Sequence, residues 1–212
     1  MPGRKDEGVS EVISFVLILA MLIVAFSLWA IYAVPAGGEQ MEEVHNVNVQ
    51  LQFSDLKTGI ENVWLSNSTG VIRESVLMLG PDISESGLEI LSFPLTRASG
   101  TLRIEADESN RITFEDVTYS PLVIRYVSAN AYVEDMDLLY WGGDGSVTVS
   151  GSTSYTLTGH QNHRVMVRAG MEDQILSGQG RAVVEYRMVK TFVAKYSSEI
   201  DADWHVFEVS VR

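Results

Sequence analysis

The side chains in this sequence that are best suited to bind a metal ion or to carry a proton are its histidines, and two of them lie close together. His160 and His163 could contact one metal ion if they stood on one turn of a helix. They follow Thr158-Gly159 in a polar stretch typical of a turn between strands, and no third ligand lies at the spacing of a zinc motif. We therefore expect a solvated loop here and predict no metal site.

Two acidic segments could supply oxygen ligands to a calcium ion. One is Glu134-Asp135-Met136-Asp137, and the other is Asp144 in the glycine-rich segment 142–145. Calcium takes about six to eight oxygen ligands, and neither segment matches the Asp-x-Asp-x-Asp-Gly loop that supplies them in known sites. We interpret both segments as surface charge.

No motif of a catalytic or cofactor-binding site is present. The chain contains no cysteine, which excludes thiol catalysis and cysteine-ligated metals. Serine nucleophile elbows, phosphate-binding loops and dinucleotide fingerprints are absent as well. We predict no catalytic residue, no cofactor and no enzyme activity, with an anchored hydrolase of unrecognised site as the alternative.

The formal net charge of −13 limits the class of partner. A strongly acidic surface disfavours binding to nucleic acid or to anionic lipid, so we predict no nucleic-acid partner. Because there is no cysteine, no disulfide bond can stabilise the folded domain, and its hydrophobic core must suffice.

Asn67-Ser68-Thr69 matches the acceptor sequence for N-linked glycosylation. The tripeptide lies in a loop of Ser, Asn and Gly residues, at the point where an expected helix gives way to strands. We expect Asn67 to be exposed and regard it as a candidate glycosylation site.

The segment Val12–Val34 carries no charge and no helix-breaking residue. A helix of this length measures about 35 Å, which is enough to cross a hydrocarbon core of about 30 Å. The apolar core of a cleaved secretory signal peptide has only about 7–15 residues, so a retained anchor fits better. We predict a leader at 1–11 and a transmembrane helix at 12–34.

The charges beside this segment predict its orientation. Arg4 and Lys5 precede it, and the next basic residue is Lys57. Because basic residues stay on the cytoplasmic side, we expect a cytoplasmic N-terminus and an exterior chain from residue 36 on.

The leader carries a family resemblance. Arg4-Lys5-Asp6-Glu7-Gly8, followed by the run Val9–Phe15, resembles the class III signal peptides of archaeal type IV pilin-like proteins. The resemblance implies that a prepilin-peptidase-like membrane enzyme cuts on the cytoplasmic side and leaves the helix on the mature protein. The candidate cleavage residues are Asp6, Glu7, Gly8 and Val9.

Glu11 is the candidate assembly residue. A cut between Gly8 and Val9 would make it the third mature residue, and a cut after Asp6 would make it the fifth, which is the usual position in pilins. In a helix bundle Glu11 could pair with the new α-amino group of a neighbouring subunit, because an unpaired acid is expensive inside a membrane. The alternative is a solvated residue in the first helical turn, where a negative charge suits the helix dipole.

Residues 35–70 are expected to form a hinge and a juxtamembrane helix. Pro35-Ala36-Gly37-Gly38 predicts a kink or a short hinge, because proline lacks an amide donor and glycine is entropically costly in a helix. Beyond it, apolar residues recur every three or four positions, which predicts one buried helix face. Its members are Val44, Val47, Leu51, Leu56, Ile60, Val63 and Trp64.

Residues 71–212 are expected to form one exterior β-domain. Short β-branched and aromatic runs alternate with Gly, Pro, Asn, Asp and Ser clusters, which is typical of strands with one buried face. The expected strands cover 101–105, 111–114, 122–127, 146–150, 155–158, 164–168, 181–193 and 205–211. We predict an N-terminal transmembrane helix followed by a mainly antiparallel, β-sandwich-like domain.

Short matches over most of the chain also resemble landmarks of an uncharacterised archaeal group of pilin-like exported proteins. They are His45-Asn46, Val49-Gln50, Asp55-Leu56, Leu79-Gly80-Pro81, Ser99-Gly100-Thr101-Leu102 and Ser177-Gly178-Gln179-Gly180. This second resemblance supports the same architecture and leaves the role open. The leader resemblance implies a single-pass surface protein that is a subunit or minor component of a type IV pilus-like filament, oligomeric through its N-terminal helix. The alternative is an anchored exterior domain that binds a cell-envelope partner without polymerising.

Overall fold

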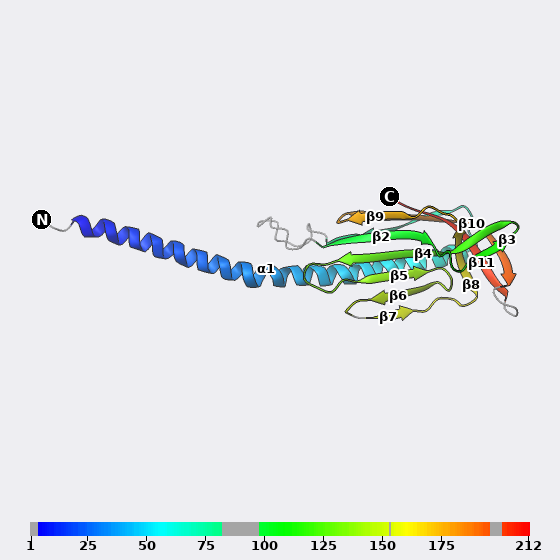
Figure 1. Ribbon diagram of the computed structural model, residues 1–212, viewed down its shortest axis with the longest axis horizontal. Coiled ribbons are helices and arrows are strands. Elements are labelled where there is room, and N and C mark those ends of the chain that lie inside the picture. The colour runs from blue at the N-terminus through cyan, green and yellow to red at the C-terminus, as the bar shows by residue number, and fades with distance from the viewer. Residues whose placement is uncertain (1–3, 82–97, 153, 196–200) are drawn as a thin grey trace.

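The computed structural model describes residues 4–81, 98–152, 154–195 and 201–212, with side chains from Glu11 on (Figure 1). The first three leader residues lie outside the described part. A long helix, α1 (Arg4–Leu65), projects from a head made of strands. The strands are β1 (Ile72–Met78), β2 (Ser99–Ala106), β3 (Ile112–Phe114), β4 (Val117–Ala129), β5 (Asp137–Trp141), β6 (Ser146–Ser150), β7 (Tyr155–Leu157), β8 (His163–Arg168), β9 (Gln174–Gly178), β10 (Arg181–Lys195) and β11 (Asp201–Val211).

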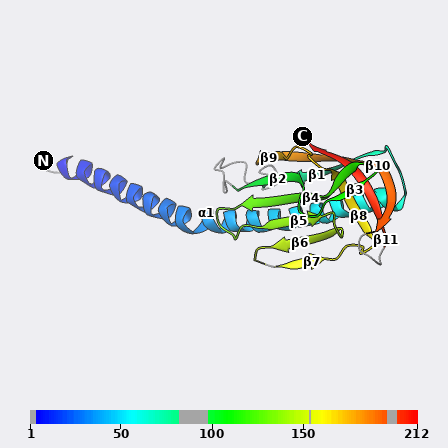
Figure 2. The same ribbon diagram turned by 45° about the vertical axis from the view of Figure 1, so that its right-hand side comes forward.

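The helix α1 runs without a break through the proposed hinge. Pro35 lies inside it, and the following glycines are helical as well. Both views show α1 changing direction near its middle, so the expected kink is present and a hinge that separates two helices is not (Figures 1 and 2). A proline in a helix interior removes one backbone hydrogen bond and bends the helix, which can continue when both flanking halves are strongly helical.

The N-terminal half of α1 has no protein around it. The described side chains from Glu11 to Ala33 are exposed, apart from the half-buried Trp29. Within the described residues, α1 is the one helix that is long and apolar enough to cross a membrane. The expectation of an N-terminal apolar helix of that length is confirmed.

The C-terminal half of α1 is part of the core of the head. Its buried face consists of Glu42, His45, Val49, Phe53, Leu56, Ile60, Val63 and Trp64. The prediction was correct for the last four of these residues and wrong for Val44, Val47 and Leu51, which are 54%, 55% and 60% exposed. The pattern misled because two polar residues, Glu42 and His45, occupy core positions and the head supplies their hydrogen bonds.

The strands form one curled mixed sheet around this half of α1. The main path of the sheet is β1-β10-β11-β8-β4-β5-β6-β7, with β2, β3 and β9 joined to it through β4 and β2. The pair β11–β8 is parallel. The main hydrophobic core therefore joins side chains of α1 with those of the strands that surround it. A sandwich of antiparallel sheets is not confirmed.

The expected strands all have a counterpart. The glycine-rich segments 142–145 and 178–180 lie at the connections between β5 and β6 and between β9 and β10. Three strands were not predicted: β1, β5 and β9. The hairpin of β10 and β11 is the longest in the head and shifts register between Met188 and Lys190. Its far end packs on β4 and β8 in a second core cluster of Tyr119, Met166, Ala202, Trp204 and Val206.

Candidate functional site

Residues 4–11 of the leader lie at the free end of α1, far from the head. The backbone at Asp6, Glu7, Gly8 and Val9 is helical, and Glu11 is exposed. The structure therefore leaves Glu11 on the bare end of α1, away from every strand of the head (Figure 1).

The acidic residues considered for calcium have structural partners. Asp135 Oδ1 accepts a hydrogen bond from the Asn130 amide at 2.7 Å, and Asp144 Oδ1 accepts one from the Ser146 amide at 2.8 Å. Asp137 pairs with Arg125. Among the described residues, no group of three or more histidine, aspartate and glutamate side chains is placed to hold a metal ion.

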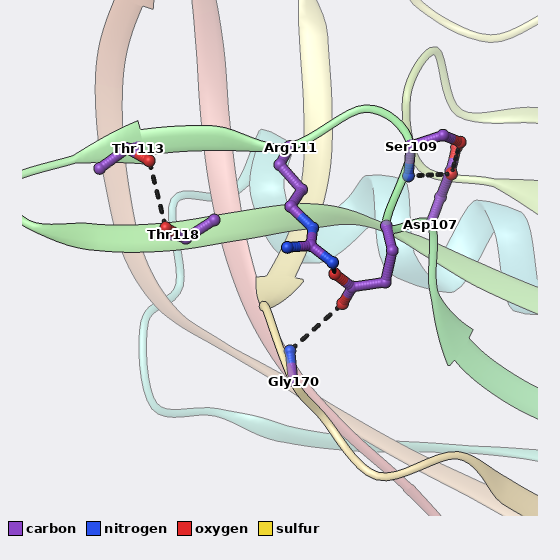
Figure 3. Close-up of polar contacts among 7 residues, drawn as sticks. Asp107, Ser109, Arg111, Thr113, Thr118 and Gly170 are labelled. Atoms are coloured by element: carbon purple, nitrogen blue, oxygen red, sulfur yellow. Dashed lines mark hydrogen bonds and ion pairs between the residues drawn. The ribbon is translucent and has the colours of Figure 1, made fainter.

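A polar turn between β2 and β3 has a structural role as well (Figure 3). Asp107 accepts hydrogen bonds from the Ser109 hydroxyl and amide and from Trp141 Nε1, and these donors, Ser109 first, lower the pKa of Asp107 to about 2. Glu108 pairs with Arg111 and accepts a hydrogen bond from the Gly170 amide at 3.3 Å. The contacts fasten this turn to the turn between β8 and β9.

Where α1 enters the head, a loop of the head surrounds the buried carboxylate of Glu42. The loop between β4 and β5 donates three successive backbone N–H groups to it. The distances from the Glu42 oxygens to the nitrogens are 3.0 Å for Ala131, 2.8 Å for Tyr132 and 3.1 Å for Val133. Successive amides of this kind form an anion-binding concavity. Backbone amides of the head thus bind the Glu42 carboxylate of the helix.

His45, one helical turn further on, is buried beside Glu42. Its Nε2 lies 3.2 Å from the hydroxyl of Tyr126, which donates in turn to the Leu79 carbonyl at 3.4 Å. Burial lowers the pKa of His45 to about 4, although the charge of Glu42 acts in the opposite direction. His45 is therefore neutral near pH 7 and donates through Nε2.

At the far end of α1, three histidines gather around Trp64. The ring of His163 stacks on the indole with centroids 4.0 Å apart, and the rings of His160 and His205 each lie 5.4 Å away. His163 Nδ1 is 3.3 Å from His205 Nε2 and 3.7 Å from a carboxylate oxygen of Asp203. One imidazole of the pair must donate and the other accept, so the accepting nitrogen carries no proton.

Burial sets the protonation of this pair. It lowers the pKa of His205 to about 4, with a further contribution from His163, and it lowers the pKa of His163 as well. His205 Nδ1 is buried without a hydrogen-bond partner in the structure. Burial therefore favours the neutral form of both imidazoles.

A pocket of about 460 Å³ opens beside these histidines. Its lining comes from the end of α1, the turn after it, and β8, β10 and β11. The residues are Trp64, Leu65, Asn67, His163, Thr191, Phe192, Val193, Asp203 and His205. Its volume lies in the range of small-molecule sites, which is about 300–1,000 Å³.

The sequence pattern indicated only some of the residues at the pocket beside Trp64. His160 is exposed, as the solvated-loop interpretation predicts, but His163 is half-buried against Trp64. Asp203 and His205 were not singled out. Their two-residue spacing puts them on one face of β11, and the parallel pairing of Asp203 with His163 brings the set together.

The candidate glycosylation site lies at the edge of the same pocket. Asn67 is exposed, as expected, and has a left-handed backbone with φ 48° just after the end of α1.

Comparison of the chain with protein-family models, with curated proteins and with solved structures finds no match.

Proposed function

We propose that the protein is a pilin-like, membrane-anchored exported protein, a subunit or minor component of an archaeal type IV pilus-like surface filament. The observation that carries this proposal is that the two halves of α1 have different surroundings. One half is bare and apolar, and one face of the other half packs in the core of the head. The leader resemblance points to the same class of protein.

The bare half needs a partner that this chain does not supply. Large apolar side chains from Val12 to Tyr32 are exposed on all sides of the helix, so they must face either lipid or other helices. In a filament protein this surface would contact lipid before assembly. After assembly the same surface would be buried in a bundle of helices.

The exposed face of α1 favours the filament over a simple anchor. Val44, Val47 and Leu51 lie within the head, beyond the expected membrane segment, and yet they face outward. Their spacing of three and four residues forms an apolar stripe on one side of the helix. Lipid is not expected to cover a stripe beside the head, whereas a neighbouring subunit would.

The test is the N-terminal residue of the mature protein, determined by mass spectrometry on native membrane and surface-shear fractions. We expect a start between Glu7 and Val9, and Glu11→Ala is expected to lower the amount in the shear fraction while membrane insertion stays intact. An N-terminus at Met1 or Pro2 in both fractions would exclude class III processing.

An anchored domain that binds a cell-envelope partner is the second candidate. The pocket beside Trp64 favours it, because it lies at the end of the head that is farthest from the apolar half of α1. In that case the leader stays on the chain and no protein is found in the shear fraction.

A further inference from the structure

The pocket at the end of α1 carries the acceptor asparagine in its lining. The backbone there is fixed by two hydrogen bonds that close the helix: the Asn67 amide donates to the Trp64 carbonyl at 3.0 Å, and the Ser68 amide donates to the Val63 carbonyl at 3.2 Å. Asn67 therefore has a set position beside the pocket, at an exposed turn that a modifying enzyme can reach.

The lining combines apolar and polar groups in a way that suits a sugar. Leu65 and Val193 are 62% and 63% exposed, which leaves two large apolar side chains uncovered at the pocket. Thr191, Asp203 and His163 supply a hydroxyl, a carboxylate and an imidazole to the same pocket. A pyranose ring has an apolar C–H face and a rim of hydroxyl groups, so it can cover the first kind of group and hydrogen-bond to the second.

We propose that Asn67 carries an N-linked glycan whose first sugar lies in this pocket, over Leu65, Val193 and His163. The donor is a sugar held at its anomeric carbon by a phosphate ester, and a separate transferase joins it to the protein. The bond from Asn67 Nδ2 to the anomeric carbon forms as the bond from that carbon to the phosphate oxygen breaks. The phosphate leaves with the electron pair, the amide loses one proton, and nothing is oxidised or reduced.

Attachment makes weak contacts sufficient. A sugar on Asn67 is already beside the pocket, so its binding there is intramolecular and needs little affinity. The expected consequence is protection of His163, which is half-buried and lines the pocket. His160 is exposed and is not part of the lining, so it stays accessible to solvent.

The first experiment tests the modification on protein from the native membrane. Trypsin cleavage after Lys57 and Arg73 releases residues 58–73, which contain the acceptor sequence. We expect a glycan mass on Asn67 in the wild type, its loss in Thr69→Ala, which keeps the asparagine, and its retention in Ser68→Ala.

This inference rests on the exterior location of the head, so the same cells are labelled with a membrane-impermeant amine reagent. Labelling of the exposed Lys195 together with an unmodified Asn67 overturns the glycan alone. An unlabelled Lys195 overturns the exterior location, and the glycan with it.

The second experiment tests the pocket. Diethyl pyrocarbonate modifies neutral imidazoles, and mass spectrometry gives the rates at His163 and His160 in the full chain in detergent. We expect His163 to react several-fold more slowly in the glycosylated wild type than in Thr69→Ala, with His160 reacting equally in both. Equal rates at His163 would overturn the placement of the sugar. If His163 reacts slowly in Thr69→Ala as well, something other than the glycan protects it, and the placement of the sugar is again overturned.

Discussion

Glu42 shows how the head recognises one residue of the helix. Its carboxylate accepts hydrogen bonds from the amides of Ala131, Tyr132 and Val133, and the side chain of His45 lies buried beside it. These contacts depend on the length and the charge of one side chain. They fix both the depth and the rotation of α1 within the sheet.

Glu42→Ala is expected to destabilise the head by about 3 kcal/mol, the order of magnitude for removing the charged partner of several hydrogen bonds. The substitution removes the buried carboxylate and leaves the part-buried amides of Ala131, Tyr132 and Val133 without their acceptor, and each costs free energy when it is not hydrogen-bonded. Urea unfolding of the full chain in detergent, followed by tryptophan fluorescence, measures the effect. Glu43→Ala is the matched control, because Glu43 is exposed at the next position. Equal stability of the two variants would contradict the role of Glu42.

Acid is expected to weaken the fold through His45 and His205. Their folded-state pKa values are about 4, below the ordinary value of 6.5, so the unfolded chain binds more protons. The stability that they contribute is complete above about pH 6.5 and is lost as pH falls toward 4, by about 3 kcal/mol for each group. The groups that face them are Glu42 and Tyr126 for His45, and His163 and Asp203 for His205.

Urea midpoints at pH 7, 5.5 and 4.5 measure this dependence. His205→Gln is expected to flatten the fall in stability over this range, since it removes one of the two titrating groups. His160→Gln alters an exposed histidine and is expected to leave the slope unchanged. A slope in His205→Gln as steep as in the wild type would refute the assignment.

At the scale of single residues, the sequence predicted exposure better than it predicted proximity. The loop character of Asn67 and His160 follows from local composition, and both side chains are exposed. The approach of His163 to Trp64 and His205 depends on three elements meeting at the end of the head, which no local pattern encodes.

At the scale of elements, alternation predicted the strands that have one apolar face. The strand β5 was missed because the acidic run 134–137 leads into it and leaves only Leu138-Leu139-Tyr140-Trp141 as a signal. The parallel pairing of β11 with β8 was missed because it joins segments that are about forty residues apart, and long-range pairing leaves no trace in local periodicity. The incorrect prediction of the buried face of α1 has a different cause, since the buried Glu42 and His45 break the hydrophobic pattern.

The two faces of α1 are distinguished by a pair of truncations. Phe53→Ala opens a cavity in the main core and is expected to cost about 3–5 kcal/mol. Leu51→Ala removes an exposed side chain and is expected to change stability by less than about 0.5 kcal/mol. Urea unfolding of both variants measures the difference. A destabilising Leu51→Ala would show that the face predicted from sequence is the buried one.

At the scale of the whole molecule, the apolar stripe on α1 gives a test of assembly that leaves the head intact. Val47→Asp puts a charge on the stripe and is expected to reduce the protein in the surface-shear fraction several-fold, because a charge at a helix contact is left without solvent. Membrane content and urea stability are expected to stay at wild-type values. Asn48→Asp adds the same charge at the neighbouring exposed position and is expected to assemble normally. Equal assembly of both variants would count against the stripe as a subunit contact.

The unbroken passage of α1 from its bare half into the head has a mechanical consequence. No flexible linker separates the two parts, since the helix that would cross the membrane is the same helix that fills the sheet. A pull on the head reaches the bare half through one continuous helix, across the bend near its middle. The force loads the buried face of the helix in shear along its whole length, so many side-chain contacts share the tension at once and the strands are not peeled apart one after another.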